Sequence, residues 1–128
     1  MQKILIVDDE AHIARVLSLW LTRHGYEIRE ACNGTAALKL LAAERVDLII
    51  SDMNMPGLDG LGLAEAVRNR FGWDIPFLVL SARCDQAKLA EKLAAFGVRL
   101  FPKPFMPSQL VAEMERMLGA TGSRSPQT

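Results

Sequence analysis

The sequence predicts an α/β fold with one doubly wound parallel sheet of five strands. Short apolar runs of strand length alternate along the chain with longer segments whose apolar residues recur at helical spacing. The 128 residues are enough for one ordinary domain and too few for two. Because 50% of the residues are hydrophobic, a chain of this length can bury a core without disulfides, metals or obligatory assembly.

The first half of the chain predicts a strand, a helix, a strand and a helix in turn. Residues 3–7 form an apolar run that predicts a buried strand. The helix that follows ends at Gly25, and residues 26–31 alternate apolar with charged side chains, as an edge strand does. A second helix begins near Gly34. The residues expected to face the core from the first helix are Ile13, Val16, Leu17, Trp20 and Leu21.

The third and fourth strands are predicted by two further apolar runs. Residues 46–51 form the third strand, and Asp59 can cap the helix after the polar, glycine-rich stretch that follows. Residues 77–80 form the fourth strand, and Asp85 can cap a helix that ends at Gly97.

The end of the chain predicts one more strand, one helix and a tail. Residues 98–101 form the fifth strand, which is an edge strand because Arg99 interrupts its apolar side chains. Pro107 suits the first position of the last helix. Small and polar residues follow, so we expect a folded domain over residues 1–118 and a flexible tail or linker over residues 119–128, with no second domain in this chain to deliver an output.

The strand order follows from the same patterns. Strands buried on both faces are continuous apolar runs, whereas edge strands alternate. The first, third and fourth strands are therefore central, and the second and fifth are edges. With right-handed crossovers this gives the order 2-1-3-4-5, which is that of the flavodoxin-like (βα)5 fold.

Charge and cysteine usage exclude several classes of function. Fifteen Lys and Arg balance fifteen Asp and Glu, so the chain lacks the basic footprint of direct nucleic-acid or anionic-membrane binding. Cys32 and Cys84 are far apart and match no zinc-ligand spacing, which predicts reduced thiols and a cytoplasmic location. The first apolar run is too short for a signal peptide or a membrane span.

Chemistry-bearing side chains follow four of the five predicted strands. Because the carboxyl ends of parallel strands share one edge of the sheet, we expect them to converge at the switch point between the first and third strands. Three neighbouring carboxylates stay ionised most readily beside a hard divalent cation such as Mg²⁺, and a Lys and a Ser supply a charge and a donor for a phosphoryl group. The residues are Asp8, Asp9, Asp52, Ser81 and Lys103.

These residues, in this order, resemble the receiver domain of two-component response regulators. The resemblance covers residues 2 to about 118. It is carried by Asp8-Asp9, by Asp52 followed by Met55-Pro56-Gly57-Leu58-Asp59-Gly60, by Ser81-Ala82, and by Lys103-Pro104-Phe105.

The resemblance implies a role for each site residue. Asp52 would be the phosphoacceptor, whose carboxylate attacks the phosphorus of a phosphohistidine or of a small acyl phosphate. Asp9 would bind Mg²⁺ (or Mn²⁺) directly and Asp8 through water, with the side chain of Asp52 and the backbone carbonyl of Asn54 as further ligands. The phosphoryl oxygens would be held by Ser81 and by Lys103, which a cis peptide bond before Pro104 would aim inward.

The resemblance also implies partners. The phosphoryl donor would be a histidine kinase or a histidine phosphotransfer protein. The signal would pass to a downstream effector domain or protein, or to a second copy of the chain, through the face formed by the fourth helix, fifth strand and fifth helix. The chain would be a signalling phosphoacceptor rather than an enzyme, with Mg²⁺-dependent self-phosphorylation from acyl phosphates and slow autodephosphorylation.

One segment departs from the family pattern. The stretch from Gly97 to Lys103 is one residue shorter than usual, so Leu100 stands three residues before the lysine, where the resemblance leads us to expect an aromatic switch residue. The aromatic residue is Phe101 instead. Either a compensating bulge puts Phe101 in that role, or the coupled motion of hydroxyl and aromatic is altered.

Three other hypotheses about the function remain open. A degenerate receiver would act as a phosphorylation-independent interaction module, although all five chemical positions are filled. A phospho-aspartyl hydrolase would need an acid where the chain has Asn54. A flavin or nucleotide carrier would need a glycine-rich anion cradle after the first strand, where the chain has two aspartates. His12 lies on the first helix, near the predicted acidic cluster, and is expected at the surface.

Overall fold

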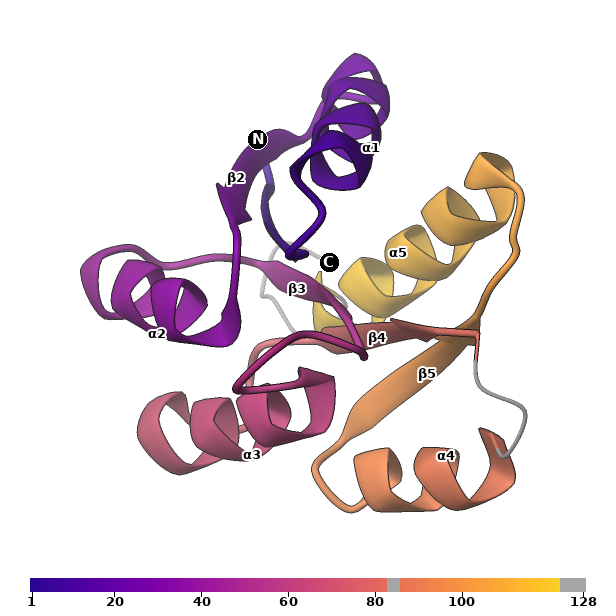
Figure 1. The fold of residues 1–128 in the computed structure, drawn as a ribbon. Helices are drawn as coiled ribbons and strands as arrows, with labels where there is room; N and C mark the ends of the chain where they lie inside the picture. The colour runs from indigo at the N-terminus through magenta and orange to yellow at the C-terminus, as the bar shows by residue number, and fades with distance from the viewer. Residues whose placement is uncertain (83–85, 123–128) are drawn as a thin grey trace.

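The computed structural model of the chain describes residues 1–82 and 86–122, and its strands and helices alternate throughout (Figure 1). No helix in this part of the chain is long and apolar enough to cross a membrane. The elements are β1 (Lys3–Val7), α1 (Ala11–Arg23), β2 (Glu27–Ala31), α2 (Gly34–Ala43), β3 (Leu48–Asp52), α3 (Gly60–Phe71), β4 (Phe77–Ser81), α4 (Gln86–Ala94), β5 (Val98–Pro102) and α5 (Pro107–Gly122).

The five strands form one parallel sheet in the order β2-β1-β3-β4-β5. Helices α1 and α5 cover one face, and α2, α3 and α4 cover the other (Figure 1). The predicted fold class and strand order are therefore confirmed. The order places the carboxyl ends of β1 and β3 next to each other at the switch point of the sheet.

The sheet divides the hydrophobic core in two. Ile4 and Ile6 of β1 pack on the side of α1 and α5, whereas Leu5 and Val7 pack on the side of α2, α3 and α4. All four are almost completely buried. Burial of one such side chain stabilises the fold by roughly 2 kcal/mol. A strand with helices on both faces must be apolar at every position, which explains the continuous apolar runs in the sequence.

Side-chain caps fix the starts of two helices. Oδ1 of Asp59, the predicted cap of α3, accepts a hydrogen bond of 2.8 Å from the backbone N–H of Gly62. Asn33 caps α2 in the same way, because its Oδ1 accepts from the N–H of Ala36 at 2.7 Å. These bonds satisfy backbone donors that the helix itself leaves unpaired.

Helix α5 begins as predicted and ends later. Pro107 is its first residue, and Gln109 Oε1 accepts a hydrogen bond of 2.9 Å from the N–H of Met106, so the start is capped although Met106 offers no side-chain oxygen. The helix continues to Gly122, four residues into the predicted tail at 119–128. A glycine weakens a helix without ending it.

Parts of three predictions lie outside the described residues: the Asp85 cap, the state of Cys84 and the tail after Gly122. Cys32 is an exposed free thiol.

The buried face of α1 differs from the prediction. Ile13 and Val16 are 42% and 67% exposed, and the residues that face the sheet most closely include the small Ala14 and Ser18. Small side chains let the helix lie close to the sheet, and the apolar stripe is wider than the face that the sheet can cover. The predicted residues that do pack against the core are Leu17, Trp20 and Leu21.

A buried arginine links α3 to two loops, the one before β4 and the one after α4. Arg68 is 5% exposed, and its guanidinium lies 5.4 Å from the ring centre of Trp73 and 5.9 Å from that of Phe77. Burial lowers the pKa of Arg68, which nearby Asp74 opposes. Its nitrogens donate to the backbone carbonyls of Phe96 (2.7 Å), Ile75 (2.8 Å), Gly97 (3.2 Å) and Gly72 (3.3 Å).

Replacement of Arg68 by alanine should lower the free energy of unfolding by about 3 kcal/mol, because it leaves buried carbonyls without donors and opens a cavity. Urea denaturation of Arg68→Ala measures the loss. Arg70→Ala, an exposed arginine on the same helix, is the control and should change the stability by less than about 0.5 kcal/mol. Equal effects of the two substitutions would contradict this role of Arg68.

Candidate functional site

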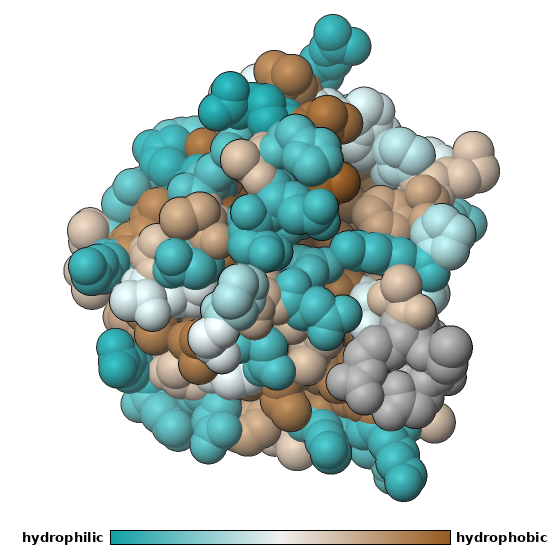
Figure 2. Space-filling view, viewed as in Figure 1, coloured by the Kyte–Doolittle hydropathy of each residue, from teal (hydrophilic) through white to brown (hydrophobic). Residues whose placement is uncertain are grey.

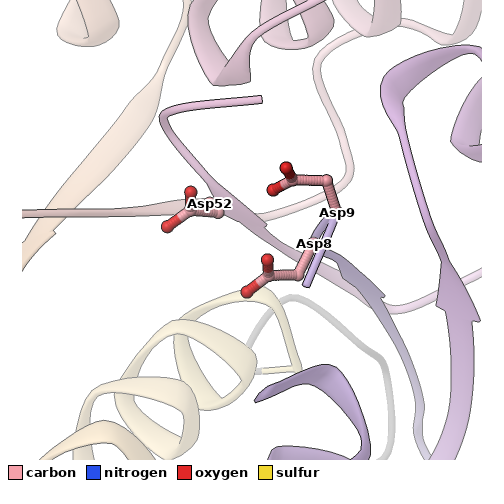
Figure 3. Close-up of side chains that lie close together, drawn as sticks. All are labelled: Asp8, Asp9 and Asp52. Atoms are coloured by element: carbon pink, nitrogen blue, oxygen red, sulfur yellow. The ribbon is translucent and has the colours of Figure 1, made fainter. Parts of the chain in front are cut away.

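Three carboxylates meet at the switch point of the sheet. Asp8 and Asp9 directly follow β1, and Asp52 is the last residue of β3. Because β1 and β3 are paired from Ile4↔Leu48 onward, their carboxyl ends lie side by side. One carboxylate oxygen from each aspartate lies within 4.8 Å of the others (Figure 3). The structure thus brings together the three acidic residues that the sequence singled out.

Asp8 is the most buried of the three. It is 6% exposed, and its Oδ1 accepts a hydrogen bond of 2.9 Å from the N–H of Glu10. Burial raises the pKa of Asp8 above its ordinary value, and the neighbouring charge of Asp52 acts in the same direction. Asp9, by contrast, is exposed. The site therefore joins a desolvated carboxylate to a solvated one.

Lys103, which follows the edge strand β5, brings a positive charge to this cluster. Its Nζ donates a hydrogen bond of 2.5 Å to Asp52 Oδ1. The Asp52 side chain is 12% exposed and that of Lys103 is 33% exposed, so this ion pair is partly shielded from solvent. The peptide bond between Lys103 and Pro104 is cis, as the resemblance implies.

Ser81 and Lys103 are held together by the sheet. The backbone N–H of Lys103 donates to the carbonyl of Ser81 at 2.8 Å, which extends the β4–β5 ladder past its last pair. Ser81 is 1% exposed. Asp52 pairs with Leu80 in the β3–β4 register, so Ser81 follows the residue directly opposite Asp52. Asn54 is exposed in the loop after β3.

The loop after Asp52 is packed against the end of β3. Met53 and Met55 are buried, and the N–H of Gly60 donates to the Met53 carbonyl at 2.9 Å. A Cβ at Gly60 would lie 2.9 Å from the Asp52 carbonyl oxygen, so only glycine fits there. This close contact fixes the backbone that carries Asp52.

The donor set suits a hard divalent cation. The oxygens come from three carboxylates at one open mouth, one of which is desolvated and repelled by its neighbours. A cation with a preference for oxygen ligands, such as Mg²⁺, would relieve that repulsion, whereas a site for Zn²⁺ would be expected to include His or Cys ligands. The residues therefore fit the ion that the sequence predicted.

The structure assigns the two candidate switch positions to opposite faces of the sheet. The β4–β5 register is regular from Phe77↔Val98 to Ser81↔Pro102 and contains no bulge. Leu100 packs in the core on the α4 side, whereas Phe101 packs on the α1 and α5 side. Neighbouring residues of a strand face opposite sides of the sheet. Without a bulge, the Phe101 ring therefore does not occupy the place that an aromatic side chain at position 100 would have.

The chain is similar to known proteins over nearly its whole length. A family model described as the response regulator receiver domain matches residues 4–115. A probable transcriptional regulator ycf27 of Cyanidium caldarium is 38% identical over 122 residues, which are 95% of this chain and 48% of that protein. The response regulator MprA of Mycolicibacterium vanbaalenii is 37% identical over 119 residues, 93% of this chain and 51% of that protein. The chain spans about half the length of these curated relatives.

Solved structures with the same fold agree with this match. The chemotaxis protein CheY4 of Vibrio cholerae superposes with a TM-score of 0.83 and 34% identity, covering 91% of this chain and 98% of that one. The response regulator TrrA of Thermotoga maritima, solved in complex with Mg²⁺ and BeF, superposes with a TM-score of 0.80 and 32% identity, covering 91% of this chain and 99% of that one.

Replacement of Asp8 by asparagine should stabilise the metal-free protein. Burial raises the pKa of Asp8 above its ordinary value of 3.8, so the folded state binds a proton at this carboxylate more tightly than the unfolded state does. The free energy of unfolding should therefore fall as pH rises from the ordinary pKa of Asp8 through its raised pKa. Asp8→Asn should weaken this fall and raise Tm at neutral pH by about 3 °C for each kcal/mol of repulsion removed. Thermal unfolding in EDTA between acidic and neutral pH measures both.

The same variant should respond less to metal. Addition of Mg²⁺ should raise the Tm of the original chain, and this gain should shrink in Asp8→Asn because one carboxylate of the cluster is lost. Asp47→Asn, which changes an exposed aspartate remote from the cluster, should keep the full gain. An equal Mg²⁺ response in all three proteins would contradict a metal site at the cluster.

Proposed function

Since the chain belongs to the response regulator receiver family, a family of two-component signalling domains, we propose that it is a phosphorylation switch whose phosphoacceptor is Asp52. The observation that carries the proposal is the setting of this carboxylate. It lies at the end of a central strand, within 4.8 Å of two further carboxylates and 2.5 Å from the ammonium of Lys103.

The reaction requires only one covalent step from the protein, which is the attack of Asp52 on phosphorus. An oxygen of the Asp52 carboxylate attacks the phosphorus of the donor and forms a P–O bond. The bond from phosphorus to the donor breaks, and its electron pair leaves with the imidazole nitrogen of a phosphohistidine or with the carboxylate of an acyl phosphate. Catalysis then depends on positioning and on neutralising the charge of the phosphoryl oxygens.

Mg²⁺ would be held by the side chains of Asp8, Asp9 and Asp52 and by the backbone carbonyl of Asn54. When bound, it neutralises charge on the carboxylates and on the incoming phosphoryl oxygens. Burial keeps Asp8 in place for this task, and its hydrogen bond to the Glu10 N–H orients its Oδ1.

Lys103 and Ser81 would hold the phosphoryl group. In the structure, Lys103 neutralises Asp52, and after transfer its ammonium can follow the negative charge outward to a phosphoryl oxygen. The Ser81 hydroxyl would donate to another phosphoryl oxygen. Because the Lys103 N–H is bonded to the Ser81 carbonyl, the two side chains start from a fixed separation.

We propose a histidine kinase or histidine phosphotransfer protein as the donor, and a downstream effector domain or protein as the recipient of the signal, with dimerisation after phosphorylation as one form of output. The cytoplasm suits the exposed free thiol of Cys32. These assignments are supported by the likeness to response regulators of about twice this length.

Incubation with Mg²⁺ and acetyl phosphate should add one phosphoryl group to the chain, as measured by intact-mass spectrometry. Asp52→Asn should abolish the modified species, because the amide is a poor nucleophile, and EDTA should suppress it. Asp47→Asn, an exposed aspartate next to β3, is the matched control and should be modified normally. If the original chain stays unmodified yet forms a partner complex that survives Asp52→Asn, the degenerate-receiver alternative is the correct one.

Removal of the Ser81 hydroxyl should slow the transfer without abolishing it. Loss of one hydrogen bond to a charged phosphoryl oxygen is worth about 1.5 to 3 kcal/mol, or roughly 10- to 100-fold in rate. The time course of the modified mass in Ser81→Ala measures this, with Ser18→Ala, a buried serine on α1, as control. An unchanged rate in Ser81→Ala would remove Ser81 from the mechanism.

A further inference from the structure

An apolar groove opens beside the acidic cluster, between α1 and the segment that joins β5 to α5. The cavity has a volume of about 310 Å³. Its wall on α1 includes Ile13 and Val16, two large apolar side chains that the sheet leaves exposed. Figure 2 shows hydrophobic surface over α1 and beside it on this face of the molecule. The other apolar lining residues are Leu17, Trp20, Leu80, Phe105 and Pro107.

The inner end of this groove is made by residues of the phosphorylation site. Lys103 and Asp8 both line it. Lys103 is the residue whose Nζ is bonded to Asp52 Oδ1 at 2.5 Å. Leu80, which also lines the groove, pairs with Asp52 in the β3–β4 register. The groove and the proposed phosphoacceptor therefore share a wall.

An aromatic pair extends that wall into the core on the same side of the sheet. The rings of Phe101 and Phe105 meet edge to face, with their centres 5.3 Å apart, and both pack against the core under α1 and α5. Lys103 lies between them in the sequence. On the other side of the sheet, toward α4, β5 presents the aliphatic Leu100. The aromatic contacts of β5 thus lie on the side of the groove.

We propose that phosphorylation of Asp52 changes the shape of this groove through Lys103 and Phe105; the inference rests on the proposed function. A phosphoryl group adds about one negative charge or more and three acceptor oxygens, which draw the Lys103 ammonium away from Oδ1. The Lys103 N–H is held by the Ser81 carbonyl, so the displacement passes to the segment that follows. That segment carries Phe105, which lines the groove together with Trp20.

The groove between α1 and the β5–α5 segment is then a surface that reports the state of Asp52. This surface differs from the face formed by α4, β5 and α5. On the α4 side, β5 presents Leu100, which has no ring and cannot form the edge-to-face contact that Phe101 makes with Phe105.

Tryptophan fluorescence can test the proposal directly, because the chain has two tryptophans. Trp20 lines the groove, and Trp73 lies 58% exposed beside Arg68. In Trp73→Phe, Trp20 is the only tryptophan. Addition of Mg²⁺ and acetyl phosphate should change its emission in proportion to the phosphorylated fraction seen by intact mass. Mg²⁺ alone, and the same additions to Trp73→Phe with Asp52→Asn, give the baseline for this change.

Two variants in the Trp73→Phe background locate the coupling. Phe105→Ala should lose most of the emission change at equal phosphorylated fraction, whereas Leu100→Ala, on the opposite face of the sheet, should retain it. Retention of the change in Phe105→Ala, or its loss in Leu100→Ala alone, would overturn the proposed path.

The two hypotheses fail in different ways. A phosphorylated species by mass with unchanged Trp20 emission would overturn the groove proposal and leave the proposed function standing. If no phosphorylated species forms at all, the proposed function is wrong and the groove proposal falls with it.

Discussion

The repulsion among three carboxylates at the ends of β1 and β3 is the constraint on which the site depends. Asp8, Asp9 and Asp52 lie within 4.8 Å of one another, and the burial of Asp8 adds a desolvation cost. Lys103 offsets part of that repulsion through its bond to Asp52. Asp8 and Asp9 directly follow β1 and Asp52 ends β3, so the pairing of these two strands keeps the three carboxylates near one another. The cluster thus favours the addition of positive charge, and Lys103 is the cation that already contacts it.

The packing of α1 links this site to the surface. Small residues at positions 14 and 18 let the helix approach the sheet, and the larger Ile13 and Val16 are left at the edge of the contact. The same arrangement creates the groove beside Lys103. Ile13 and Val16 thus belong to the wall of the groove rather than to the core.

The aromatic residue of β5 stands at position 101 rather than 100, and this decides the side of the sheet on which its ring packs. Successive residues of a strand face opposite sides, so a shift of one position moves an aromatic ring from the α4 side of the sheet to the α1 and α5 side. The regular β4–β5 register leaves no bulge to correct this. Phe101 consequently meets Phe105, and Leu100 takes the position toward α4.

The sequence by itself determined the strand order and the convergence of Asp8, Asp9, Asp52, Ser81 and Lys103 on one edge, because apolar period and chain order suffice to place the ends of parallel strands. Tertiary structure alone decided which face of α1 is buried, which side of the sheet Phe101 takes, and that Arg68 is a buried tie between loops. These depend on the close approach of elements remote in sequence. Periodicity shows that a face is apolar, but only the fit against neighbouring side chains fixes how much of it is covered.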